Sequence, residues 1–102
     1  MPFPFVEAPR LRDRPALVVS AGSLGGEAEL LWVLMITSAA NAGWPGDISL
    51  EACFAECGLN VPCVIRTAKI STVEVSRARK TGRLPDDLLL EVQRMIKAHL
   101  NL

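Results

Sequence analysis

The 102-residue chain has few of the side chains on which common catalytic and binding chemistries depend. It contains no tyrosine, one histidine (His99) and three cysteines, at positions 53, 57 and 63. This odd cysteine number, with one distant histidine, does not match the paired spacing of a zinc site, so we expect reduced thiols and no metal. The absence of tyrosine also argues against a groove for Pro-rich peptides, because such grooves are lined by clustered aromatic rings.

Long hydrophobic runs are absent as well. The longest, Leu30–Ile36, is far shorter than the roughly 20 apolar residues that span a bilayer. Residues 1–5 lack the basic segment and long apolar stretch of a secretory signal. We therefore expect no membrane association and a cytoplasmic location. Because half of the residues are hydrophobic, the chain is expected to fold, as a single domain over residues 1–102.

Positive charge is missing from the middle of the chain. Residues 15–65 contain no Lys or Arg, although five acidic residues lie there, whereas basic residues gather in segments 10–14 and 66–83. If the fold brings the two basic segments together, they form a face that attracts anions. The alternative is that these charges lie in solvated turns.

The hydrophobic pattern predicts five short strands followed by one helix. The strand candidates are 16–20, 30–37, 47–50, 63–67 and 69–76, and the glycines of 21–27 indicate a loop. Proline and two carboxylates at 85–87 are typical of a helix start, and apolar residues then recur at helical spacing to about residue 100. The predicted fold class is therefore α+β, mainly β: a small, strongly curved antiparallel sheet or barrel with a C-terminal helix at about 85–100.

Several stretches, read in order, resemble one protein family. They are PFPF at 2–5, RPALVVS at 14–20, MITS at 35–38, WPGDI at 44–48, GLNVPCVIRTAKI at 58–70 and GRLPDDLLLEV at 82–92. Together they are similar to the MazF/PemK family of toxin endoribonucleases, and most similar to its PemK-like branch. The resemblance covers nearly the whole chain, although the N-terminal strand is shorter than in other members.

The resemblance implies a fold, an activity and partners. The family is an SH3-like barrel with a C-terminal helix, usually a homodimer. Its members cut single-stranded RNA, often mRNA, at preferred sequences without metal or cofactor. A cognate antitoxin inhibits them by laying a peptide across the RNA groove of the dimer.

Three residues are candidates for catalysis. Metal-free cleavage uses the 2′-hydroxyl of the RNA as nucleophile and needs donors that hold the charge of the crowded phosphorane. Arg14 matches the arginine of the family's Arg-Pro motif, and a guanidinium fork suits a phosphate. Thr37 matches the threonine that ends the central strand. Arg66 matches an Arg-x-Asp pattern, but Ala68 stands in place of the carboxylate, which makes an identical proton relay doubtful.

Four further residues are candidates for RNA binding. Arg12 belongs to the basic N-terminal segment, Ser38 adjoins the threonine, and Lys69 is positioned for a backbone contact. Trp44 lies in a predicted loop where its ring is available to stack on a base, whereas Trp32 lies within the apolar run and is expected in the core. Two alternatives to a toxin nuclease stay open: a family member that binds RNA or an antitoxin peptide without cutting, and a non-enzymatic SH3-like interaction module.

Overall fold

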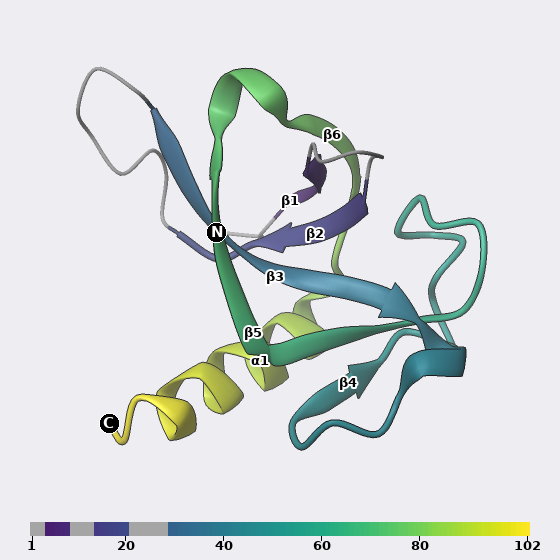
Figure 1. Cartoon of the computed structure of the whole chain (residues 1–102). Helices are drawn as coiled ribbons and strands as arrows, with labels where there is room; N and C mark the ends of the chain where they lie inside the picture. Colours follow the sequence, from purple (N-terminus) through teal and green to yellow (C-terminus); the bar gives the residue numbers. More distant parts are fainter. Residues whose placement is uncertain (1–3, 9–13, 21–28) are drawn as a thin grey trace.

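The computed structural model describes residues 4–8, 14–20 and 29–102 (Figure 1). Its elements in chain order are β1 (Pro4–Ala8), β2 (Arg14–Val18), β3 (Leu30–Ser38), the 3-10 turn η1 (Ala39–Asn41), β4 (Asp47–Ser49), β5 (Cys63–Glu74), the 3-10 turn η2 (Val75–Arg77), β6 (Arg79–Arg83) and α1 (Asp86–His99). The predicted mainly β fold with one C-terminal helix is confirmed. The predicted loop at 21–27 lies outside the described residues.

All of the described strands join one antiparallel sheet, in the order β4-β5-β3-β2-β1-β6. Figure 1 shows how strongly this sheet curls, with the long β5 bent sharply along its length. β1 has a hydrogen-bonded neighbour on each side, so it is not an edge strand.

The strand prediction from the hydrophobic pattern was wrong in three places, and one of them is β1, which was not among the five candidates. The expected strands at 63–67 and 69–76 are one twelve-residue strand, β5. Leu34 pairs with Ile70 but Met35 pairs with Arg66, so β5 bulges between these two partners. A bulge breaks the alternation of side chains without ending the strand. β6 was not predicted at all, because its sequence RKTGR has no apolar alternation.

The sheet separates two groups of buried side chains. α1 covers one face, where the larger group packs. The members are Leu17, Leu34, Ile36, Ile48, Leu50, Cys57, Cys63, Ile65, Leu84, Leu89 and Val92. The smaller group packs on the opposite face and comprises Ala16, Val18, Val33 and Met35. Since side chains alternate along a strand, β2 and β3 each supply residues to both groups.

The helix begins and ends as its sequence predicts. Pro85 is the N-cap, two aspartates occupy the first turn, and a lysine and a histidine occupy the last. The two aspartates at the start and Lys97 at the end complement the helix dipole. Leu89 and Val92 are buried against the sheet, so packing of one face holds the helix in place.

A tight turn brings the two ends of the curled sheet together. The turn at 51–58 follows β4 and ends at Gly58, whose φ of +83° favours glycine. A Cβ atom on Gly82 of β6 would collide with the carbonyl oxygen of Cys57. Only glycine permits this close approach, which places the segment after β4 against β6, at the opposite edge of the sheet.

None of the helices in the described ranges combines the length and the apolar character required to cross a bilayer.

Candidate functional site

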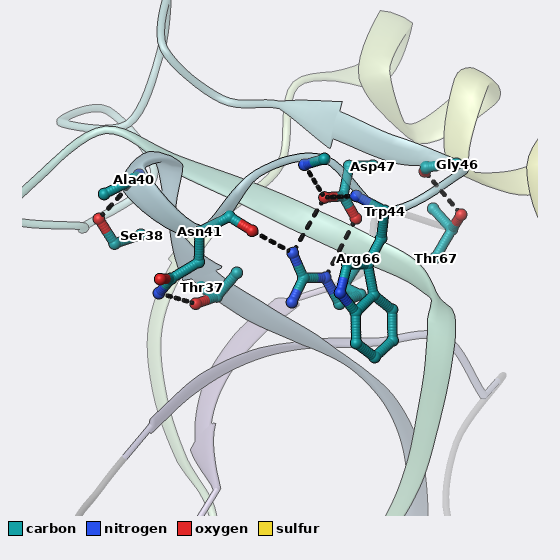
Figure 2. A network of polar contacts seen from close by, with 10 residues as sticks. Thr37, Ser38, Ala40, Asn41, Trp44, Gly46, Asp47, Arg66 and Thr67 are labelled. Carbon is teal, nitrogen blue, oxygen red and sulfur yellow. Dashed lines mark hydrogen bonds and ion pairs between the residues drawn. The ribbon is translucent and has the colours of Figure 1, made fainter.

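The guanidinium group of Arg66 is held from three directions (Figure 2). Its Nε donates to Oδ1 of Asp47 at 3.2 Å and its Nη2 to Oδ2 at 3.1 Å, a bidentate ion pair. Nη2 also donates to the backbone oxygen of Asn41 at 2.6 Å. The ring of Trp44 covers the guanidinium, with Cζ 4.2 Å from the ring centroid. These contacts leave Nη1 as the terminal nitrogen without a hydrogen bond to a described residue.

Asp47 is itself fixed by the turn that precedes β4. Its Oδ2 accepts hydrogen bonds from the backbone N–H groups of Gly43 and Trp44, each at 3.2 Å. The hydrogen bond from Arg66 is the main reason why the pKa of Asp47 lies below its usual value; the two backbone donors add to this effect and burial opposes it. The carboxyl is therefore ionised at neutral pH and acts as the counter-charge of Arg66.

Thr37 is connected to the same arginine through one intervening residue. Nδ2 of Asn41 donates to Oγ1 of Thr37 at 3.0 Å, while the backbone oxygen of Asn41 accepts from Arg66. Ser38, the next residue, caps η1 by accepting from the backbone N–H of Ala40 at 3.3 Å. Two of the predicted catalytic residues, 37 and 66, thus belong to one hydrogen-bonded network (Figure 2).

The register of the sheet places Arg14 on the same face as this network. Met35 of β3 pairs with Ala16 of β2 on one side and with Arg66 of β5 on the other. Directly paired residues point to the same face, and residues two apart along a strand do so as well. Arg14 lies two residues from Ala16, and Thr37 lies two residues from Met35. Both therefore share the face of Arg66. This face is opposite to α1.

Arg14 differs from Arg66 in its exposure and in its hydrogen bonding. Arg14 is exposed, and its side chain has no hydrogen bond or ion pair to the described residues. Lys80 lies on the same face, because Val6 of β1 pairs with both Ala16 and Lys80. Basic residues from both segments therefore lie on one face of the sheet. They are not on adjacent strands, because β1 lies between Arg14 on β2 and the basic residues of β6.

The remaining predicted residues lie around this network or beyond it. Trp44 is 48% exposed, as a loop tryptophan was expected to be, but one side of its ring is taken by Arg66. Lys69 is exposed in the bulge of β5. Arg12 lies outside the described residues. Among the described residues, Lys69 has no hydrogen bond to the network.

The expectation that Trp32 is a core residue was wrong, since its side chain is 48% exposed. It lines an apolar groove of about 750 Å³, which lies between β3, β5 and the last turn of α1. Leu34 and Ile36, farther along the same strand, belong to the buried group that packs with α1, whereas the groove lies between Trp32 and the end of the helix. A run of apolar residues cannot reveal where the covering helix stops.

Two residues of the network were missed by sequence reasoning. Asn41 contributes a backbone oxygen to Arg66, and no sequence pattern marks such a contact. Asp47 was assigned only as the start of a strand, although it lies within the WPGDI block. Its pairing with Arg66, 19 residues away, places a carboxylate beside the arginine where position 68 has none. The missing Arg-x-Asp carboxylate was a signal that a partner should be sought elsewhere.

The cysteines form no disulfide and lie away from this face. Cys53, Cys57 and Cys63 are free thiols, and burial, helped by the contact with Cys53, raises the pKa of Cys57 to about 12. Within the described ranges, no three His, Cys, Asp or Glu side chains are grouped closely enough to hold a metal ion.

Comparison with solved structures identifies similar folds. The Mycobacterium tuberculosis toxin MazF-mt6 superposes with a TM-score of 0.78 at 22% identity, and 97% of each chain is covered. A MazE–MazF structure from Deinococcus radiodurans has a TM-score of 0.73 at 24% identity, covering 97% of this chain and 92% of the other. A second crystal form of MazE–MazF has a TM-score of 0.69 at 26% identity, with 96% and 92% covered. No curated protein sequence gives a significant match.

The family itself is identified by sequence. A family model described as a PemK-like, MazF-like toxin of type II toxin–antitoxin systems matches residues 4–100. This match includes the whole of the described network and the helix that packs behind it. Because it extends over nearly the whole chain and agrees with the shared fold, the chain belongs to the PemK-like, MazF-like family of toxins of type II toxin–antitoxin systems.

Proposed function

We propose that this toxin is a sequence-selective endoribonuclease that cleaves single-stranded RNA, mRNA included, without a metal ion. The observation that carries the proposal is the shared face of Arg14, Thr37 and Arg66. Two guanidinium groups and a hydroxyl on one face of a small sheet suit a phosphodiester, because guanidinium donors match phosphate oxygens in charge and geometry.

The proposed reaction is an internal transesterification. The 2′-oxygen of the RNA attacks the adjacent phosphorus while its proton passes to a base. The bond from phosphorus to the 5′-oxygen breaks, and that oxygen takes up a proton. The products are a 2′,3′-cyclic phosphate and a 5′-hydroxyl. No water is activated in this step, so the protein has to supply orientation, proton transfer and charge stabilisation.

The two arginines divide the work of charge stabilisation. The guanidinium of Arg14 has no hydrogen bond or ion pair to a described residue, and we assign it direct contact with the scissile phosphate, where it stabilises the phosphorane. Arg66 is locked by Asp47 and offers Nη1, which makes it a fixed positive donor with little freedom to lose on binding. Thr37 holds the phosphate or the 2′-oxygen through its hydroxyl. Asp47 is ionised and paired, which makes it a counter-charge and not the base.

Four further residues extend the contact along the RNA strand. Trp44 offers the ring side that Arg66 does not cover to an unstacked base, and base–aromatic stacking is tolerant of sequence. Lys69 and Arg12 contact phosphates, and Ser38 adds a hydroxyl next to Thr37. These contacts give affinity that falls with salt, as expected for neutralised phosphates.

The proposed regulatory partner is a cognate antitoxin that covers this RNA face, and the active form is a homodimer. Support for the antitoxin comes from the toxin–antitoxin family and from the MazE–MazF structures that share the fold. An antitoxin peptide with acidic side chains would compete with RNA for Arg14 and the nearby basic residues.

The test is cleavage of mixed RNA by the purified protein in the presence of a chelator, with mapping of the product ends. We expect cleavage with cyclic phosphate and 5′-hydroxyl ends. Arg14→Ala should lower the rate by about 100- to 1000-fold, the usual cost of losing one preorganised donor to a developing charge. Arg94→Ala is the control, because Arg94 is an exposed arginine on α1.

Expression in cells gives a second readout. Without antitoxin, the wild-type chain should arrest growth and Arg14→Ala should relieve the arrest. Equal toxicity and equal cleavage by the variant would remove Arg14 from the chemistry, and a requirement for magnesium would indicate another enzyme class. RNA binding without cleavage would favour the non-cutting alternative.

A further inference from the structure

A second hydrogen-bonded chain links the last turn of α1 to the turn that precedes β4. Oγ1 of Thr67 lies 2.7 Å from the backbone oxygen of Gly46 and 3.0 Å from Nε2 of His99. Figure 2 shows the Thr67–Gly46 part of this chain directly beside Arg66 and Asp47. Helix, strand and turn are thus joined at a single hydroxyl.

The direction of these hydrogen bonds follows from the chemistry of the groups. A carbonyl oxygen can only accept, so the single hydroxyl proton of Thr67 is donated to Gly46. The hydroxyl oxygen must then accept from the ring, which means that Nε2 of His99 carries a proton. Thr67 is 4% exposed, so water has little access to replace His99 as the donor.

The hydrogen bond between Thr67 and Gly46 extends the pairing of β4 with β5 by one residue beyond the last backbone pair. Asp47 pairs with Arg66, and the same register would bring Gly46 opposite Thr67. The threonine hydroxyl takes the place of the next backbone hydrogen bond. Gly46 and Thr67 are therefore adjacent in sequence to Asp47 and Arg66, the two members of the ion pair.

Gly46 fits closely into this arrangement. Its φ is +84°, and an added Cβ would lie 2.6 Å from Oγ1 of Thr67 and 3.2 Å from Nε2 of His99. Both values are shorter than normal contacts of a Cβ atom. The turn can therefore follow this path only because residue 46 is glycine, and it then rests directly on the end of α1.

We propose that His99 is a positioning residue for the guanidinium of Arg66. It acts through Thr67, which holds Gly46 and so sets the position of the turn segment 43–47. That segment supplies both the ring and the carboxylate that fix Arg66. The inference rests on the proposed nuclease function only for its effect on cleavage, because its effect on Arg66 is structural and can be measured without RNA.

The test compares His99→Ala, which removes the donor, with His99→Gln, which keeps an N–H group at a similar reach. With the nuclease active, we expect His99→Ala to lower kcat by about fivefold to tenfold, the equivalent of one ordinary hydrogen bond, with little change in KM. His99→Gln should restore most of kcat. Lys97→Ala, at an exposed neighbouring position on α1, is the matched control and should match the wild type.

A second readout follows the side chain of Arg66 by NMR. Its Nε–H is donated to Asp47, so it should exchange slowly with water in the wild type and about fivefold to tenfold faster in His99→Ala. The signal is assigned by its loss in Arg66→Lys. Thr67→Val should reproduce the faster exchange, and Thr67→Ser should not.

The two readouts separate the inference from the proposed function. If the wild type cleaves RNA and His99→Ala leaves both kcat and Arg66 exchange unchanged, the inference is overturned and the nuclease stands. A fall in kcat without a change in exchange also overturns it, because His99 would then act by another route. If the wild type does not cleave RNA, the exchange measurement alone decides, and an unchanged Nε–H would reject the positioning role.

Discussion

Arg66 illustrates how a charged side chain can be buried within the face that is proposed to bind RNA. Its side chain is 11% exposed and that of Asp47 is 8% exposed, so both charges have lost most of their water. A buried pair of this kind adds little net stability compared with apolar side chains, but removal of one member leaves an uncompensated charge. The energetic role of the pair is therefore best tested by removing one charge while keeping the shape.

At this residue scale, Asp47→Asn should destabilise the fold by about 3 kcal/mol, the typical result of breaking a buried ion pair. Urea unfolding at neutral pH measures the difference. Glu51→Gln is the matched control, because it makes the same change at an exposed carboxyl close to β4 and should cost less than about 0.5 kcal/mol. A similar effect of both substitutions would contradict a specific role for the Asp47 pair.

The pH dependence of stability should report the same carboxyl. The pKa of Asp47 is lowered in the folded state from an ordinary value of 3.8, mainly by Arg66. Its contribution to stability is therefore complete above that ordinary value and is lost as pH falls through the lower folded-state pKa. Unfolding curves of the wild type and Asp47→Asn should accordingly converge between about pH 5 and about pH 2. A stability gap that stays constant over this range would show that the charge is not its source.

At the element scale, α1 could be predicted from its local sequence, whereas the full length and bulge of β5 could not. The start, the terminal charges and the apolar stripe of α1 involve residues close together in the chain, so the sequence predicts them. The bulge of β5 depends on which residues of β3 lie opposite, and a pattern within one strand cannot contain that information. β6 shows the same limit, since a polar strand gains its place by pairing with β1.

Two adjacent leucines of α1 test how the helix is held. Leu89 is 7% exposed against the core, whereas Leu90 is 60% exposed. Leu89→Ala should cost about 2–4 kcal/mol through lost burial and a residual cavity, and Leu90→Ala should cost less than about 1 kcal/mol. Thermal or urea unfolding compares them directly. Equal costs would mean that the helix contributes by propensity and not by packing.

At the scale of the whole molecule, the distribution of charge matters more than its total. The chain has a formal charge of zero, yet Arg14 and Lys80 share one face of the sheet. Among the described residues, one copy places only these few basic side chains on that face by strand register, and RNA affinity grows with the number of phosphates neutralised. Two copies with their basic faces aligned would bind a longer stretch of RNA.

We therefore expect the active protein to be a homodimer. Light scattering after size-exclusion chromatography should give about twice the 11.0 kDa mass of one chain. Cleavage assays over a dilution series should lose specific activity as the dimer dissociates. A monomer with full activity would contradict the expectation that two copies act together on the RNA.

The sequence by itself determined the β-rich class, the closing helix and the family, because each is recorded in local patterns or in ordered blocks of residues. It also singled out Arg14, Thr37 and Arg66 as candidates. Only the tertiary structure decided that they share a face, that Asp47 supplies the carboxylate absent at position 68, and that His99 reaches the turn beside Arg66. The physical reason is distance along the chain: strand register and helix docking join residues 19 and 32 positions apart, and a hydrophobic period carries no record of such partners.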